Sequence, residues 1–209
     1  MSQAMIDHLV YGVVDLGEGV AELERRLGVR AAPGGRHQGR GTHNALLGLG
    51  GQTYLEVIAR DPDQEPPAGS LPFGLETLAE PRLVGWAIRV HGIEDFVDRV
   101  RGAGFDPGEV KEMGRLRPDG VRLAWRLTQD PPKGCSALIP FVIDWLDNPH
   151  PSESAPSGAT LERLSAEDPD PESVRGPLRA LEAGIAVAEG PRPALIAVLQ
   201  TPRGRVELR

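Results

Sequence analysis

Residues 7–16 read Asp7-His8-Leu9-Val10-Tyr11-Gly12-Val13-Val14-Asp15-Leu16, a short apolar strand followed by an acidic residue where a helix should begin. The helix predicted after Asp15 has apolar residues at helical spacing on one face, and Gly28 is expected to end it. The same order of strand, acidic helix start, glycine and further strands begins again near Val84 and near Ala159. A repeat of this length is a half-domain, so we predict a sheet that curves around a central cleft.

The three copies predict how the chain is organised. Two βαβββ units, residues 1–60 and 83–146, are expected to form one domain over residues 1–150. In the first unit, the glycine-rich stretch 34–41 is interpreted as a loop before a hairpin that turns at Gly50-Gly51. A third βαβββ-like unit, residues 158–209, should pack on this domain or extend its sheet. The predicted fold class is α+β, with a curved mixed sheet or half-open barrel and helices outside.

Composition narrows the possible partners and location. The formal net charge of −7 over 209 residues makes nucleic acid and anionic membranes poor partners, so a small molecule is expected. The single cysteine, Cys135, excludes an internal disulfide framework and has no histidine beside it that would favour a catalytic thiol. No signal peptide and no apolar run of about 20 residues is found, which predicts a cytoplasmic protein. The odd number of units suggests a homodimer, in which an unpaired half could complete a barrel.

Several stretches together resemble the vicinal oxygen chelate superfamily, and most closely its glyoxalase-like branch. This superfamily includes glyoxalase I, fosfomycin-resistance proteins and extradiol dioxygenases. Residues 7–16 begin the resemblance, which covers roughly the first 150 residues. In the first unit it continues through Gly34-Gly35-Arg36-His37, Gly41-Thr42-His43-Asn44-Ala45-Leu46-Leu47 and Tyr54-Leu55-Glu56-Val57-Ile58; in the second it includes Pro118-Asp119-Gly120-Val121, Leu123-Ala124-Trp125-Arg126 and Pro140-Phe141-Val142-Ile143-Asp144-Trp145.

The resemblance implies paired units whose barrel floor holds one divalent metal. Its usual ligands are a histidine early on the first strand and a glutamate late on the fourth strand of each unit, positions taken here by His8 and Glu56. An imidazole nitrogen with a carboxylate oxygen suits Zn, Fe, Ni, Mn or Co. Strand alternation independently places Tyr54 and Glu56 on one face, away from Leu55 and Val57.

The second unit departs from this pattern, because Trp86 takes the histidine position and Asp144 the glutamate position. Two protein ligands rarely hold a catalytic metal, so a complete site would need Asp144, Glu207, His37 or His43. The alternative is a metal-free pocket, in which Glu56, with His8, acts as a general base or only satisfies an internal partner.

Other side chains are candidates for contacting a substrate. His37, His43 and the following Asn44 flank a glycine-rich turn that could close over the cleft, although a purely structural turn fits the same residues. Arg115 is a candidate clamp for a carboxylate. Trp125 could stack on a ligand or simply fill the core. Asp144, late on the fourth strand of the same unit, is a further candidate.

Two functions therefore stay open. The first is an enzyme, a lyase, isomerase or dioxygenase-like protein that acts on a small carbonyl or hydroxy compound. The second is a protein that binds or sequesters a small molecule without chemistry. The substrate cannot be derived from a fold, because it depends on the lining of the pocket.

Overall fold

A computed structural model describes residues 4–65, 69–116, 120, 122–129 and 137–209, so Cys135 lies outside the described residues. The first unit contains β1 (Met5–Gly12), α1 (Leu16–Leu27), β2 (Ala32–His37), β3 (Thr42–Gly48) and β4 (Tyr54–Arg60), and the short helix η1 (Pro72–Thr77) follows. The second contains β5 (Arg82–Arg89), α2 (Ile93–Gly102), β6 (Glu109–Leu116), β7 (Arg122–Gln129) and β8 (Phe141–Asp144), followed by η2 (Pro151–Glu153). The third contains β9 (Thr160–Asp168), α3 (Pro171–Ala180), β10 (Ala186–Glu189), β11 (Ala194–Thr201) and β12 (Gly204–Leu208).

The first two units form an eight-stranded barrel. Its strands pair in the order β1-β4-β3-β2-β6-β7-β8-β5, and β5 pairs back onto β1. Within each unit the first and fourth strands run parallel, whereas the other neighbours are antiparallel. Between β2 and β6, Arg36 and Leu116 are the one registered pair among the residues that the structure describes. The predicted α+β fold with a curved mixed sheet is confirmed, and the ring closes within one chain.

Helix α1 forms where the sequence indicates it. The Asp15 carboxylate accepts a hydrogen bond from the Glu18 backbone N–H at 2.8 Å, which caps the first turn. Val20, Leu23 and Leu27 are buried on one face. Gly28 ends the helix with φ 75°, a left-handed conformation that glycine adopts without steric cost.

The interpretation of residues 34–41 as a loop was wrong at its start, because β2 runs through Ala32–His37. Glycine is needed at position 34 because β2 approaches other side chains closely. A Cβ there would lie 2.2 Å from Asn44 Oδ1 and 2.6 Å from Arg115 Nη1. The apolar segment before Trp145 also forms a shorter strand than predicted, since β8 begins only at Phe141.

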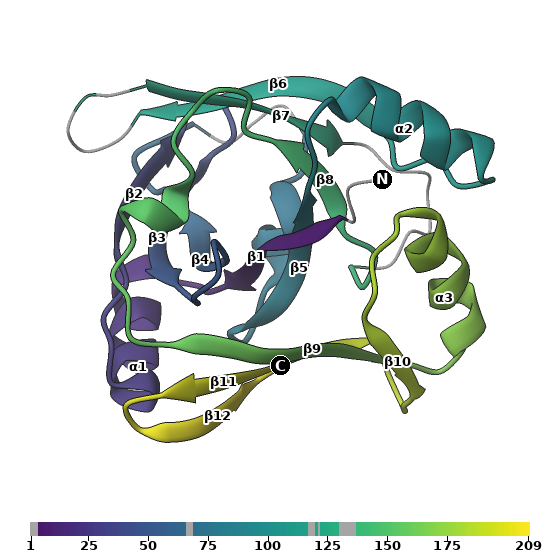
Figure 1. The fold of residues 1–209 in the computed structure, drawn as a ribbon. Coiled ribbons are helices and arrows are strands. Elements are labelled where there is room, and N and C mark those ends of the chain that lie inside the picture. The colour runs from purple at the N-terminus through teal and green to yellow at the C-terminus, as the bar shows by residue number, and fades with distance from the viewer. Residues whose placement is uncertain (1–3, 66–68, 117–119, 121, 130–136) are drawn as a thin grey trace.

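The third unit keeps the βαβββ element order but pairs its strands differently. Its sheet has the order β10-β9-β11-β12, so β9 pairs with β10 and β11, whereas β1 pairs with β4, the fourth strand of its own unit. Figure 1 shows this sheet along one side of the barrel, with α1 at one end and α3 at the other. The Leu83 N–H donates to the Arg209 carbonyl at 2.8 Å and joins β5 to the C-terminal end.

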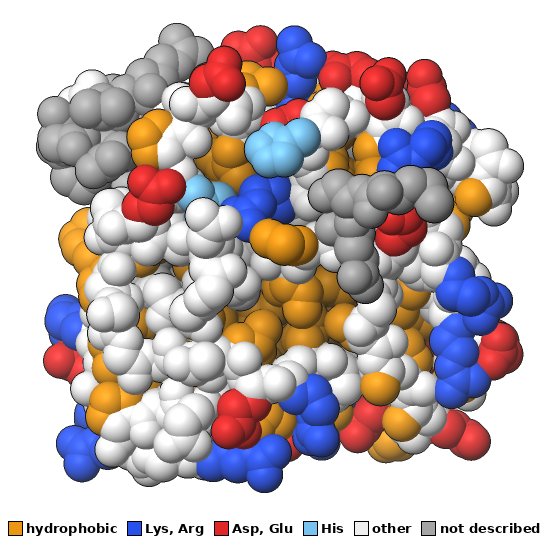
Figure 2. Space-filling model, in the orientation of Figure 1, with side chains coloured by type: hydrophobic (Ala, Val, Ile, Leu, Met, Phe, Trp, Pro, Cys, Tyr) orange, Lys and Arg blue, Asp and Glu red, His pale blue; other side chains and the backbone are white. Residues whose placement is uncertain are grey.

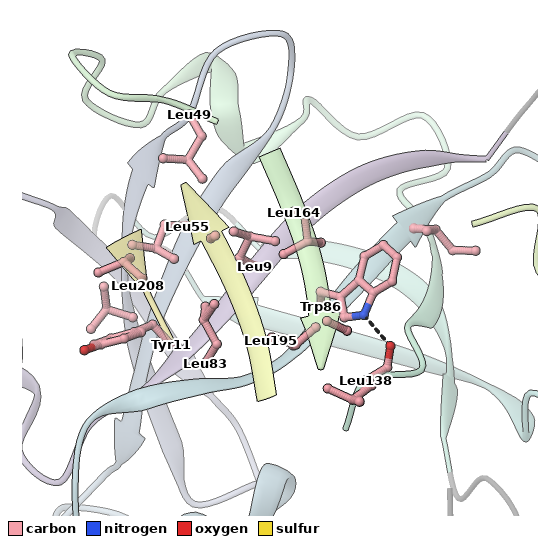
Figure 3. Packing of buried hydrophobic residues seen from close by; sticks show 14 of the residues in the cluster. Leu9, Tyr11, Leu49, Leu55, Leu83, Trp86, Leu138, Leu164, Leu195 and Leu208 are labelled. Carbon is pink, nitrogen blue, oxygen red and sulfur yellow. Dashed lines mark hydrogen bonds between the residues drawn. The ribbon is translucent and has the colours of Figure 1, made fainter. Parts of the chain in front are cut away.

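A shared hydrophobic core holds the second sheet against the barrel. Leu9 and Leu55 point outward from β1 and β4, and Leu195 and Leu208 meet this surface from β11 and β12 (Figure 3). All four side chains are at most 2% exposed. Because outward-facing residues of the barrel strands form this core, the inward-facing residues are left to line the interior. No helix within the described ranges is long and apolar enough to cross a bilayer.

Candidate functional site

The barrel encloses a cavity of about 730 Å³ that opens to the surface. The face drawn in Figure 2 is hollowed near its centre, with hydrophobic side chains inside the hollow and charged side chains mostly toward the edge. Inward-facing residues of several strands bring most of the predicted site residues to the cavity wall: His8, His37, Asn44, Glu56, Arg115 and Trp125. A volume of this size suits an organic molecule with a hydrophobic body.

Strand geometry explains how His8 and Glu56 meet. On β4, Tyr54, Glu56 and Ile58 all line the cavity, as strand alternation predicts. On β1, the register against β5 shifts between Ile6 and His8, so Asp7 has no registered partner. Such a bulge lets neighbouring side chains turn toward each other.

Asp7 holds His8 in one orientation. The two side chains are buried, and Asp7 Oδ1 lies 2.6 Å from His8 Nδ1. Burial alone would raise the pKa of Asp7, but hydrogen bonds from His150 and His8 outweigh it and hold that pKa well below its usual value. Asp7 is therefore a carboxylate that can only accept, so His8 Nδ1 donates to it, and in the neutral imidazole Nε2 is the nitrogen with the free lone pair.

Asp7 is also the centre of a wider cluster. Its Oδ2 accepts hydrogen bonds from Trp145 Nε1 at 3.0 Å and His150 Nε2 at 2.9 Å. Arg89 Nη1 lies 3.7 Å from the same oxygen. The strand β1, the end of β8 and the segment that leads to the third unit are thus tied together behind His8.

Asn44 fixes the other side of the site. Its Nδ2 donates to Glu56 Oε1 at 2.5 Å and lies 3.4 Å from His37 Nε2, while its Oδ1 accepts from Arg115 Nη1 at 3.4 Å. His37 Nδ1 completes the chain with Thr42 Oγ1 at 3.0 Å. Burial is the main cause that lowers the pKa of His37, so this ring is neutral and its Nε2 accepts from Asn44.

His8 and Glu56 face each other across the space between these clusters. His8 Nε2 is 3.7 Å from Glu56 Oε2, and the His8 ring stacks on Tyr54 with centroids 4.7 Å apart. Burial raises the pKa of Tyr54 well above its usual value, so the phenol stays neutral. If His8 Nε2 takes up a proton, the imidazolium ring lies between the carboxylates of Asp7 and Glu56, which stabilise its positive charge.

The residues present do not fit the divalent metal that the family resemblance implies. His37 Nε2 and Glu56 Oε1 are both engaged by the Asn44 amide, which leaves His8 Nε2 and Glu56 Oε2. The second unit adds no ligand, because Trp86 is buried with its indole N–H on the Leu138 carbonyl at 2.9 Å. Among the described residues, no three His, Cys, Asp or Glu side chains group as metal ligands would. Two ligands are too few for a catalytic metal site.

Two predicted substrate contacts, Asp144 and His43, lie elsewhere. Asp144 Oδ2 accepts from the Gly92 N–H at 2.9 Å and caps the start of α2, and its Oδ1 accepts from the Leu146 N–H. His43 is on β3 between Thr42 and Asn44, so alternation turns it away from the cavity. Neither residue lines the cavity. Glu207 pairs with Arg209 on the second sheet, outside the barrel.

Asp7 and His150 were not predicted as site residues. Asp7 precedes His8 in sequence, and regular alternation would have pointed it to the opposite face, so only the bulge reveals its role. His150 is far from Asp7 in sequence, and no local pattern connects them.

Trp125 lines the cavity in an unusual state. Its Nε1 is buried without a hydrogen-bond partner, the one such side-chain atom among the residues described. Its ring lies edge-on to His37 at 6.2 Å and is tilted against Trp145 at 5.1 Å. The ring therefore contributes packing rather than a hydrogen bond to the protein.

Comparison with known proteins establishes the family. A family model described as a glyoxalase-like domain matches residues 6–182. The chain therefore belongs to the glyoxalase-like domain family, and the resemblance seen in the sequence is confirmed. No curated protein matches the sequence.

Solved structures resemble this chain to different degrees. A hypothetical protein from Staphylococcus aureus superposes with a TM-score of 0.66 at 13% identity, covering 97% of this chain and 83% of that one. Methylmalonyl-CoA epimerase from Mycobacterium tuberculosis gives 0.46 at 19% identity, with 71% and 92% covered. A methylmalonyl-CoA epimerase in complex with methylmalonyl-CoA and NH4+ gives 0.48 at 16% identity, with 72% and 100% covered. The first of these supports a shared fold.

Proposed function

We propose that this protein is an enzyme that moves a proton on a small carbonyl or hydroxy compound bound in the barrel cavity. The observation that supports this most is the orientation of His8. Its Nδ1 is held by the Asp7 carboxylate, and its Nε2 faces Glu56 in the cavity. A histidine held in this way by a carboxylate is suited to act as a general base.

The proposed step needs no group beyond those in the cavity wall. His8 Nε2 takes the proton from a carbon next to the substrate carbonyl; the C–H electron pair forms the carbon–carbon double bond and the carbonyl π pair moves onto oxygen, which gives an enolate. The proton then returns from the imidazolium to carbon or to oxygen, so no oxidant or reductant is needed. Glu56 stabilises the imidazolium, and Arg115 supplies positive charge on the same side of the cavity for the enolate oxygen.

Deuterium exchange tests this proposal. The purified protein is incubated in D₂O with a panel of 2-oxo acids and 2-hydroxy ketones, and exchange at the carbon next to the carbonyl is followed by NMR. We expect exchange that depends on protein and falls at least about a hundredfold in His8→Gln and Glu56→Gln. Unchanged exchange in both variants, with circular dichroism confirming the fold, would contradict the proposal.

A binding protein without chemistry is the second candidate, favoured by the largely apolar wall of the cavity. If ligands of the panel bind by calorimetry and none exchanges a proton in the presence of the wild-type protein, this candidate replaces the enzyme.

A further inference from the structure

We infer that the indole N–H of Trp125 is a hydrogen-bond donor for the ligand of the cavity, and that it selects compounds with a carbonyl oxygen on an apolar body. This inference concerns binding alone. It deepens the proposed function and rests on it only in taking the cavity as the ligand site.

The three tryptophans of the chain are buried, but only two have a partner for their indole N–H. Trp86 Nε1 donates to the Leu138 carbonyl at 2.9 Å, and Trp145 Nε1 donates to Asp7 Oδ2 at 3.0 Å. Trp125 is only 5% exposed, and its Nε1 has no partner among the residues that the structure describes. A buried donor in this state costs free energy, which an acceptor from outside the protein would recover.

Trp125 belongs to the inner face of the barrel. It lines the cavity together with Leu127, two residues further along β7, and with Met113, its registered partner on β6. Alternation along these paired strands puts the three side chains on the same face. The indole ring is therefore part of the cavity wall and not of the core between the two sheets.

The rings next to Trp125 do not supply the missing acceptor. His37, edge-on at 6.2 Å, has both ring nitrogens engaged in hydrogen bonds within the protein. Trp145, tilted at 5.1 Å, carries only a donor, which is already bonded. We therefore expect the acceptor for Trp125 to come from the contents of the cavity.

A ligand reaches Trp125 Nε1 only when a neighbouring side chain moves, because the wall covers this atom. Met113 lies opposite Trp125 in the strand register and is only partly buried. Its unbranched thioether side chain can change rotamer, as methionines do at adaptable binding surfaces. We expect binding to open the wall at this place.

A carbonyl oxygen matches this indole N–H better than a hydroxyl does. The indole nitrogen only donates, and the ring belongs to a largely apolar cluster with Leu46, Leu123 and Ile143. A hydroxyl there would bring an O–H that needs its own acceptor, whereas a carbonyl brings none. A site with a donor in this position rejects an analogue that lacks the acceptor.

Nuclear magnetic resonance of the indole groups tests the inference. Each of the three tryptophans gives one indole N–H signal, and the signal of Trp125 is the one lost in Trp125→Phe. Acetophenone is the carbonyl probe, and it should move this signal downfield. The matched probe is α-methylstyrene, which has a methylene group in place of the carbonyl oxygen and shares the phenyl ring, and it should not move the signal in this way.

Titrations followed by the backbone N–H signals give the affinity of each probe. The ratio of the affinity for acetophenone to that for α-methylstyrene should fall about fivefold in Trp125→Phe, the size of one net hydrogen bond. Trp86→Phe is the matched control, because it removes an indole N–H that is bonded within the protein and does not line the cavity. This variant should keep the wild-type ratio.

The outcomes also separate this inference from the proposed chemistry. In His8→Gln, the preference for acetophenone should persist even though proton exchange is lost. Two results would overturn the inference whatever the exchange experiment shows: no shift of the Trp125 signal with acetophenone, or the same affinity ratio in the wild-type protein and in Trp125→Phe.

Discussion

At the scale of single residues, hydrogen bonds within the protein determine which polar atoms of the site are left for a ligand. The Asn44 amide occupies Glu56 Oε1 and approaches His37 Nε2, and Asp7 occupies His8 Nδ1. The sequence could bring His8 and Glu56 to one cavity wall, because their strands and spacing carry the family pattern. It could not predict the contacts of Glu56 with Asn44 and of His8 with Asp7, because these hydrogen bonds form only in the folded barrel.

Asp7→Asn should show how much stability this carboxylate contributes. Its pKa is lower in the folded than in the unfolded protein, so its contribution is complete above the unfolded pKa and is lost as pH falls through the folded pKa. We expect a loss of about 3–5 kcal/mol in the free energy of unfolding at pH 7, as for a broken buried ion pair. Urea denaturation at pH 7 and in steps below pH 4 should show the difference from wild type shrinking as the medium becomes more acidic. A difference that stays constant down to the lowest pH at which both proteins fold would contradict this assignment.

The tryptophans offer a second residue-scale comparison. Trp86 Nε1 has a carbonyl partner and Trp125 Nε1 has none, although both side chains are buried. Trp86→Phe should cost about 1–3 kcal/mol more stability than Trp125→Phe, because only the former leaves a buried partner unsatisfied. Thermal and urea unfolding of the two variants measure this. Equal losses would mean that Trp125 Nε1 finds a partner in solution.

At the scale of elements, the secondary structure was predicted wrongly where glycine residues are concentrated. Helices α1 and α2 lie close to their predicted positions, because caps and apolar spacing are local signals. Strand β2 was missed, because glycine and proline at positions 33–35 are typical of loops. Strand β2 needs such residues for two reasons. Its register shifts between Pro33 and Gly35, and it approaches Asn44 and Arg115 closely. Both are tertiary features, which a local sequence pattern does not reveal.

Gly34→Ala should therefore damage the site more than the fold. The added methyl group would overlap Asn44 Oδ1 and Arg115 Nη1, so these side chains must move apart and release Glu56. We expect the proposed proton exchange to slow at least about tenfold, as for loss of one hydrogen bond to a charged group. Gly102→Ala is the control, since Gly102 is the exposed last residue of α2 and a Cβ there meets nothing within 4 Å. Proton exchange at the wild-type rate in Gly34→Ala would show that the Asn44–Arg115 contact is dispensable.

At the scale of the whole molecule, the third unit packs against the outside of the barrel and does not add strands to it. The sequence predicts its elements well, but repeated element order does not fix strand pairing, and β9 pairs unlike β1. The eight-stranded ring closes within one chain, so no partner chain is needed to complete it. The second sheet instead covers the outward faces of Leu9 and Leu55. This joint core argues that the barrel and the third unit unfold together.

Leu199→Ala tests that cooperativity from the far side of the joint core. Leu199 is fully buried on β11, and all three tryptophans of the chain belong to the barrel units. Tryptophan fluorescence therefore reports the barrel, while far-ultraviolet circular dichroism reports both sheets. Loss of this side chain should lower stability by about 2–5 kcal/mol and shift both urea transitions to the same lower midpoint.

Arg205→Ala is the control, because this side chain is exposed on the neighbouring strand, and it should leave both midpoints unchanged. If the fluorescence midpoint stayed at the wild-type value while the dichroism midpoint fell, the third unit would be an independent domain, since its core could then weaken without cost to the barrel.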